Sequence, residues 1–122
     1  MMRQVLLVED SEELADNLAE ILRDADFETK VVHSAEQALG VLASQVFDGI
    51  VSDLRLPQKT GVELLAFVRE RGLTTPVILM SAFADEQARL HAQRLGAVAL
   101  LDKPFNCAQL VALLEGNCNA RP

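Results

Sequence analysis

The sequence has no tryptophan or tyrosine and only two cysteines, Cys107 and Cys118. Two thiols without a second pair make neither a zinc site nor a disulfide framework, so we expect both to be free. The apolar run near the N-terminus, residues 5–8, is too short for a signal peptide or a membrane span. The sequence therefore predicts a cytoplasmic chain without membrane association.

Basic residues are also scarce, because 11 Lys and Arg stand against 18 Asp and Glu, for a net charge of −7. Lys and Arg supply most of the affinity for nucleic-acid phosphates, so an acidic chain without a basic stripe argues against direct DNA or RNA binding. Low-complexity sequence is absent, and 50% hydrophobic with 24% charged residues is an ordinary globular balance. The length of 122 residues suits a single domain. We expect its core over about residues 4–115, followed by a fraying tail at about 116–122.

The sequence does contain a regular alternation of apolar runs with segments of helical spacing. Uninterrupted runs are typical of parallel strands that are buried on both faces. Strands alternating with helices predict an α/β domain of five βα units, with right-handed crossovers and helices on both sheet faces. The runs are residues 5–8, 31–32, 50–51, 77–80 and 98–101. Ser34 and Asn106 fit helix N-caps, each followed three residues later by an amide, Gln37 and Gln109.

Residues with reactive or metal-binding side chains follow four of these runs. Glu9 and Asp10 follow the first, Asp53 the third, Ser81 the fourth and Lys103 the fifth. The carboxyl ends of parallel strands share one sheet edge, where open α/β sheets bind their ligands. The sequence therefore predicts that these five side chains meet in one crevice.

Three carboxylates in one crevice call for a cation, because each close pair repels by about 4 kcal/mol at ~4 Å and an effective dielectric of about 20. Oxygen donors without His or Cys at these strand ends favour Mg²⁺, which often bridges to a phosphate. A carboxylate can accept a phosphoryl group as an aspartyl phosphate, while a hydroxyl and an ammonium bind the phosphoryl oxygens. Asp53, Ser81 and Lys103 fit these roles.

In order and spacing, these motifs resemble the receiver domain of two-component response regulators, including the chemotaxis regulators. The resemblance covers residues 5–114 and implies a flavodoxin-like, doubly wound sheet of five parallel strands in the order 2-1-3-4-5 with five helices. The matching motifs are Val8-Glu9-Asp10, Ser52-Asp53-Leu54-Arg55-Leu56-Pro57 with Gly61, Ser81-Ala82 and Lys103-Pro104-Phe105.

The resemblance also implies a role for each site residue. Asp53 would accept a phosphoryl group from the phosphohistidine of a sensor histidine kinase or phosphotransfer protein. Asp10, Asp53 and the backbone carbonyl of Arg55 would hold Mg²⁺, with Glu9 acting through a metal-bound water. Ser81 would follow the phosphoryl group and Lys103 would pair with it. Ala82 would leave the space that access to the site requires. The Lys103–Pro104 peptide bond would be cis. We expect a phosphorylation-controlled switch, monomeric or weakly dimeric, whose only chemistry is phosphorylation and dephosphorylation of its own Asp53.

Two positions depart from the family pattern. Leu100 stands three residues before Lys103, where relatives often have a Tyr or Phe whose ring swings inward when the hydroxyl residue moves. We therefore expect only weak coupling through Leu100. Thr60 stands where many relatives are acidic, and we interpret it as a neutral loop variation.

Three other side chains lie near strand ends or in helices without matching a motif of the site. Phe83 follows Ser81 closely, where a core residue and a cover over the pocket fit about equally, and we interpret it as part of the pocket rim. His33 and His91 lie in unrelated segments and are interpreted as surface residues.

Three other functions are compatible with parts of this pattern. A degenerate receiver would bind partners without phosphorylation, but its site would lack a key residue. A flavin electron carrier shares the fold, yet Glu9 and Asp10 would repel the flavin phosphate, and no Trp or Tyr can stack on the ring. A magnesium-dependent phosphatase would need a lid over a substrate pocket, for which the short loops leave no room.

Overall fold

The computed structural model of the chain describes residues 2–118 and contains one sheet of five parallel strands in the order β2-β1-β3-β4-β5. The predicted α/β architecture and strand order are confirmed. The strands are β1 Arg3–Val8, β2 Phe27–Val32, β3 Gly49–Asp53, β4 Val77–Ser81 and β5 Ala99–Asp102. The helices are α1 Glu12–Asp24, α2 Ala35–Leu42, α3 Gly61–Glu70, α4 Glu86–Arg94 and α5 Cys107–Asn117.

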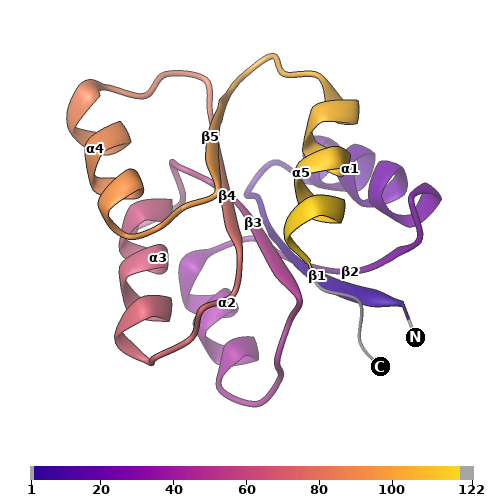
Figure 1. Cartoon of the computed structure of the whole chain (residues 1–122), viewed down its shortest axis with the longest axis horizontal. Helices are drawn as coiled ribbons and strands as arrows, with labels where there is room; N and C mark the ends of the chain where they lie inside the picture. Colours follow the sequence, from indigo (N-terminus) through magenta and orange to yellow (C-terminus); the bar gives the residue numbers. More distant parts are fainter. Residues whose placement is uncertain (1, 119–122) are drawn as a thin grey trace.

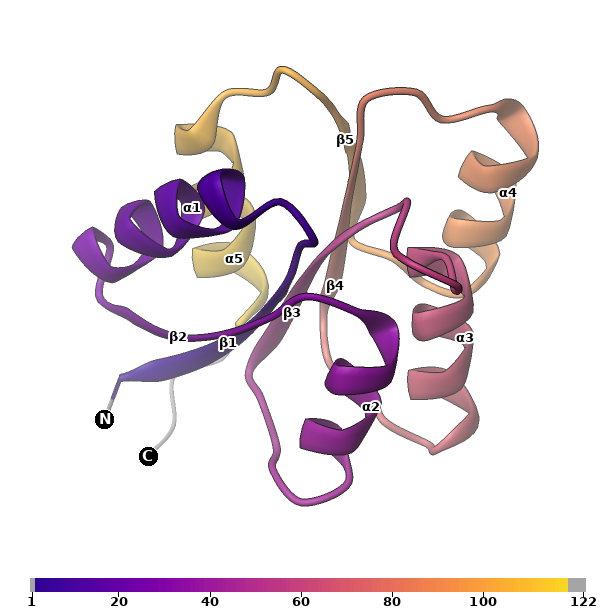
Figure 2. The same cartoon turned by 180° about the vertical axis from the view of Figure 1, so that it is seen from behind.

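The sheet lies between two helical layers, with α1 and α5 on one face and α2, α3 and α4 on the other (Figures 1 and 2). Alternate residues of β1 serve the two layers: Val5 and Leu7 join the core beneath α1 and α5, while Leu6 and Val8 join the opposite core. Since both faces are covered, the residues of the central strands β3 and β4 are all buried. This explains the uninterrupted apolar runs.

Side-chain caps begin all five described helices. Ser34 and Asn106 are N-caps as predicted. The side-chain amide oxygen of Gln37 accepts a hydrogen bond from the His33 N–H (2.8 Å), and the side-chain oxygen of Asn106 accepts one from the Ala108 N–H (2.8 Å). Thr60 is not a neutral variation, because it forms a reciprocal capping box with Glu63 that begins α3.

The predicted fraying after residue 115 is wrong for the first part of the tail. Helix α5 continues through Gly116 to Asn117, and Cys118 packs into the core at 3% exposure. The reason is Gly49, whose missing side chain leaves the space that the Cys118 thiol fills, since a Cβ there would lie 2.8 Å from Sγ. Residues 119–122 lie outside the described residues.

Helix α4 is the helix most weakly anchored in the sheet. Ala92 is its one fully buried residue. Its C-terminal end is held instead by Arg69 of α3, whose guanidinium donates to the carbonyls of Leu95 (2.8 Å) and Gly96 (3.2 Å). The same guanidinium donates to two carbonyls of the α3–β4 connection, those of Leu73 (3.0 Å) and Thr75 (2.9 Å). The C-terminal end of α4 is therefore held by a side chain of another helix.

Within residues 2–118, every helix falls short of the length and apolarity needed to cross a bilayer.

Candidate functional site

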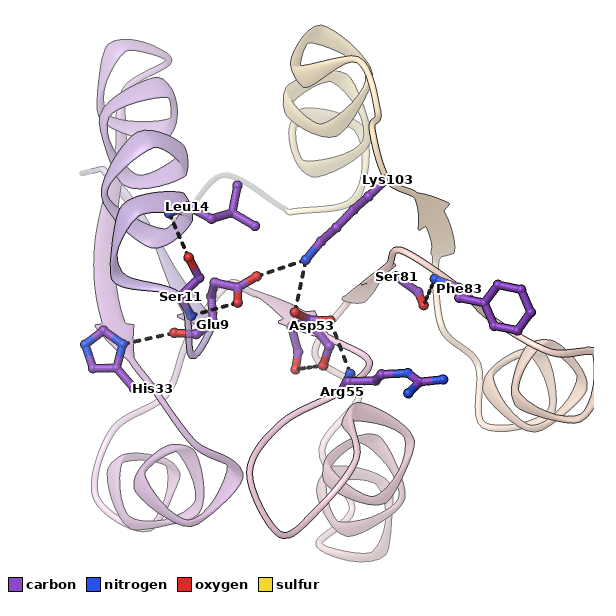
Figure 3. Close-up of polar contacts among 10 residues, drawn as sticks. Glu9, Ser11, Leu14, His33, Asp53, Arg55, Ser81, Phe83 and Lys103 are labelled. Atoms are coloured by element: carbon purple, nitrogen blue, oxygen red, sulfur yellow. Dashed lines mark hydrogen bonds and ion pairs between the residues drawn. The ribbon is translucent and has the colours of Figure 1, made fainter.

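The strand register brings the predicted site residues to one edge of the sheet. Val8 pairs with Ser52, Asp53 with Met80, and Ser81 with Asp102, so the carboxyl ends of β1, β3, β4 and β5 lie level. The residues that end or follow these strands therefore project into a common space, as Figure 3 shows for Glu9, Asp53, Ser81 and Lys103.

Three carboxylates gather at this edge. Glu9, Asp10 and Asp53 each offer one oxygen within 4.8 Å of the others. Glu9 and Asp53 are buried, whereas Asp10 is exposed at the mouth of the site. A compact set of oxygen donors that is open on one side suits a hard divalent cation that keeps some of its waters.

Lys103 bridges the two buried carboxylates. Its ammonium donates to Asp53 Oδ2 (3.0 Å) and to Glu9 Oε1 (3.2 Å), as Figure 3 shows. Burial acts to lower the pKa of Lys103, but the hydrogen bonds and charges of Asp53 and Glu9 outweigh it, so that this pKa is raised. The ammonium therefore remains charged beside Asp53. The Lys103–Pro104 peptide bond is cis, as the resemblance implied.

Glu9 is buried although it follows the end of β1, with only 1% of the residue exposed. Burial raises the pKa of Glu9 from its usual 4.5 to about 7, and the neighbouring Asp53 and Asp10 act in the same direction. The Ser11 N–H, which donates to Glu9 Oε2 (3.1 Å), and Lys103 both oppose this rise. Desolvation thus exceeds the attraction of the lysine, because Lys103 is shared with Asp53.

Asp53 also contacts the turn that follows it. The Arg55 N–H donates to Asp53 Oδ1 (3.2 Å), and Arg55 forms an isolated bridge with Thr60 that closes the turn before α3. The Arg55 backbone therefore borders the carboxylate cluster. Its carbonyl as a metal ligand stays a prediction.

The hydroxyl side of the site is built by the β4–α4 connection. Ser81 is 1% exposed, and its Oγ accepts a hydrogen bond from the Phe83 N–H (3.0 Å). Ala82 is exposed. Phe83 is no core filler, because it is 72% exposed, and it lines a hollow of about 570 Å³ between α3 and α4. Leu100 is half-buried against the core beneath α2, α3 and α4.

His33 is half-buried rather than a simple surface residue, and it is a neighbour of the site that the sequence did not predict. Its ring Nδ1 lies 2.9 Å from the Glu9 carbonyl oxygen (Figure 3), while the Glu9 N–H donates to Val32 O (3.0 Å). The signal was available, since His33 directly follows the second strand and the order 2-1-3-4-5 places that strand beside β1. His91 is exposed, as predicted.

Comparison with known protein families decides the assignment of the chain. The model of the response regulator receiver domain matches residues 5–115. The chain belongs to this family.

Full-length members of the receiver family include relatives of this chain. Response regulator protein FleR of Pseudomonas aeruginosa is 39% identical over 114 residues, covering 93% of this chain and 24% of FleR. Transcriptional regulatory protein CpxR of Escherichia coli K12 is also 39% identical over 114 residues, covering 93% of this chain and 48% of CpxR. The chain thus spans about a quarter to a half of the length of these relatives.

Solved receiver structures have the same architecture. The non-phosphorylated HemR receiver domain of Leptospira biflexa is 30% identical and superposes with a TM-score of 0.87, covering 98% of both chains. Chemotaxis response regulator CheY4 of Vibrio cholerae is 29% identical with a TM-score of 0.86, covering 95% of this chain and 98% of CheY4. The chain is therefore a signalling module with the receiver fold, as the motifs predicted.

Proposed function

We propose that Asp53 accepts a phosphoryl group from the phosphohistidine of a sensor histidine kinase or phosphotransfer protein, and that the modified domain changes its binding to an output protein. The observation that supports this most directly is the Lys103 ammonium, which bridges the buried carboxylates of Asp53 and Glu9. A cation fixed on a buried acceptor carboxylate is placed where phosphoryl charge would arrive.

The donor set fits Mg²⁺. Asp10 and Asp53 would hold it with the Arg55 carbonyl, and Glu9 would act through a metal-bound water, since hard cations prefer oxygen ligands and these carboxylate oxygens lie within 4.8 Å of one another. Magnesium bound there would offset the negative charge of the carboxylates and of the incoming phosphoryl oxygens.

The chain's own groups account for the rest of the transfer. A carboxylate oxygen of Asp53 forms a bond to phosphorus while the bond from phosphorus to the donor histidine nitrogen breaks. Lys103 then balances the charge of the acyl phosphate, and the Ser81 hydroxyl donates to a phosphoryl oxygen. Because Asp53 is 8% exposed, water has limited access to the acceptor.

The alternative functions fit the site less well. A degenerate receiver is disfavoured because the acids, the acceptor, the hydroxyl and the lysine all lie at this edge. A flavin phosphate would meet Glu9 and Asp10, which bear the same sign of charge. A phosphatase with an external substrate would need a lid, and the β3–α3 and β4–α4 connections are short.

The acidic composition still predicts no direct nucleic-acid contact by residues 2–118. CpxR, by its name a transcriptional regulatory protein, is about twice as long as the matched region. Regulation of transcription through direct DNA contact would therefore require residues outside 2–118.

Intact-mass measurement tests the proposal. With Mg²⁺ and acetyl phosphate, we expect the protein to gain the mass of one phosphoryl group and Asp53→Asn to gain none. Asp102→Asn is a matched control, because this exposed carboxylate lies beside Lys103 and should not affect the acceptor. An equal gain in Asp53→Asn would place the acceptor elsewhere, and no gain in the unmodified chain would overturn the proposal.

A further inference from the structure

An exposed aromatic side chain is attached directly to the hydroxyl of the site. Phe83 is 72% exposed, the most exposed of the large apolar side chains among residues 2–118. Its N–H is held by the Oγ of buried Ser81 at 3.0 Å. In Figure 3 its ring points away from Asp53 and towards the start of α4. Exposure of a benzyl ring to water is unfavourable, so the ring would favour a buried position if one became available to it.

A hollow lined by both apolar and polar side chains lies beside this ring. It measures about 570 Å³ and runs between α3 and α4, with Phe83 on its rim. Its apolar lining includes Leu54, Val62, Ala66, Ala88 and Leu95. Leu54 and Arg55, at one end of the hollow, directly follow Asp53 in the chain. The hollow therefore extends from the turn that follows Asp53 to helix α4.

We propose that Phe83 is a phosphorylation-driven plug: when Ser81 turns towards the phosphoryl group, the Phe83 ring moves from solvent into the α3–α4 hollow. This inference rests on the proposed function, because the phosphoryl group on Asp53 supplies the force on Ser81.

The hydrogen bond between Phe83 and Ser81 gives the mechanism. The Ser81 Oγ can donate to a phosphoryl oxygen while it still accepts from the Phe83 N–H, because a hydroxyl has one donor and two acceptor sites. A bonded N–H follows its acceptor, so movement of Oγ draws residues 82–85 towards Asp53 and Arg55. The ring then approaches the Leu54 end of the hollow, where burial of apolar surface favours it.

The neighbouring element permits this movement. Helix α4 buries only Ala92 fully, so the segment before it carries little packing that must be broken. Leu100 is half-buried and lacks the reach of an aromatic ring, whereas Phe83 is an aromatic residue whose N–H is hydrogen-bonded to Ser81.

The absence of tryptophan from the chain makes the plug measurable. Phe83→Trp provides a single fluorophore, and Val46→Trp is a matched control at a similarly exposed position (67%) in the α2–β3 connection. On addition of Mg²⁺ and beryllofluoride, a phosphoryl mimic, we expect Trp emission in Phe83→Trp to shift to the blue and acrylamide quenching to fall about two-fold, because the ring leaves water. The Val46→Trp protein should not respond.

A second variant tests the destination of the ring. Ala66→Phe, combined with Phe83→Trp, places a ring in the hollow and should abolish the blue shift while intact mass still shows phosphorylation by acetyl phosphate. If Phe83→Trp takes up one phosphoryl group but the exposure of its indole does not change, the plug is refuted and Asp53 phosphorylation stands. If no variant takes up a phosphoryl group, the proposed function fails and this inference fails with it.

Discussion

Glu9 is the residue at which burial and charge oppose each other most strongly. Its carboxyl group is enclosed, shares Lys103 with Asp53, and has a pKa raised from 4.5 to about 7. A carboxyl with a raised pKa holds its proton in the folded state at pH values where the unfolded chain has lost it. It therefore stabilises the fold below pH 4.5, and this contribution is lost as the pH rises through about 7.

The pH dependence of stability without metal tests this. With a chelator present, the unfolding free energy of the unmodified protein, relative to Glu9→Gln, should fall by roughly 2–4 kcal/mol between about pH 5 and pH 8. Glutamine keeps the size of the side chain and does not titrate in this range. Urea unfolding at each pH gives the difference, and a flat or rising difference would show that Glu9 is ionised in the folded protein throughout.

Asp10 and Glu9 should contribute unequally to magnesium binding. Asp10 is exposed at the mouth of the site, whereas both oxygens of Glu9 already accept hydrogen bonds, from Lys103 and from Ser11. We expect Asp10→Ala to weaken Mg²⁺ binding about ten-fold or more, and Glu9→Ala to weaken it less. A magnesium titration followed by amide NMR shifts measures both affinities, and the reverse order would make Glu9 the direct ligand.

Among the structural elements, α4 depends most on a single side chain. The Arg69 guanidinium joins the end of α4 to the α3–β4 connection through four backbone carbonyls. Charged hydrogen bonds of this kind contribute more than neutral ones, and carbonyls that lose them are left without a partner.

Arg69→Met should lower the unfolding free energy by about 2–4 kcal/mol, because methionine keeps apolar bulk and removes every donor. Arg69→Lys should also lose most of this part of the unfolding free energy, since an ammonium cannot reproduce the planar fork of the guanidinium. Arg94→Met changes an exposed arginine in the last turn of α4 and should cost less than about 0.5 kcal/mol. Equal midpoints in urea for the Arg69 and Arg94 variants would contradict the assignment of the clamp.

The sequence allowed the elements to be predicted better than their ends. Strand ends at Asp53 and Ser81 could be located because an apolar run stops at a polar residue. The capping role of Thr60 was not predicted, since a threonine before glycine is common in loops and only its pairing with Glu63 identifies the capping box. Arg69 could not have been found at all, because its carbonyl partners lie in other elements and carbonyls carry no sequence signal. Phe83 could be assigned no more than a place on the pocket rim, since an aromatic residue after a strand fits a core or a rim equally.

At the scale of the whole molecule, helices of one layer should respond differently to phosphorylation. With beryllofluoride and Mg²⁺, we expect amide shift changes to extend from residues 82–86 along α4, with a coupling free energy of about 1 kcal/mol. Helix α2, on the same face of the sheet, is the internal reference and should shift little. Two-dimensional NMR spectra with and without the mimic decide this, and a silent α4 would confine the signal to the site.

The contacts of Arg3 have a consequence for how the domain can be connected to others. Its guanidinium donates to the Cys118 carbonyl (3.0 Å), so the first strand and the end of α5 meet at the amino edge of the sheet. The chemistry lies at the opposite edge, and a five-residue strand such as β4 separates them by about 16 Å. A segment joined at either end of the described chain therefore starts at the edge of the sheet opposite Asp53. Near its junction it would sense phosphorylation as a displacement of helices rather than by contact with the phosphoryl group.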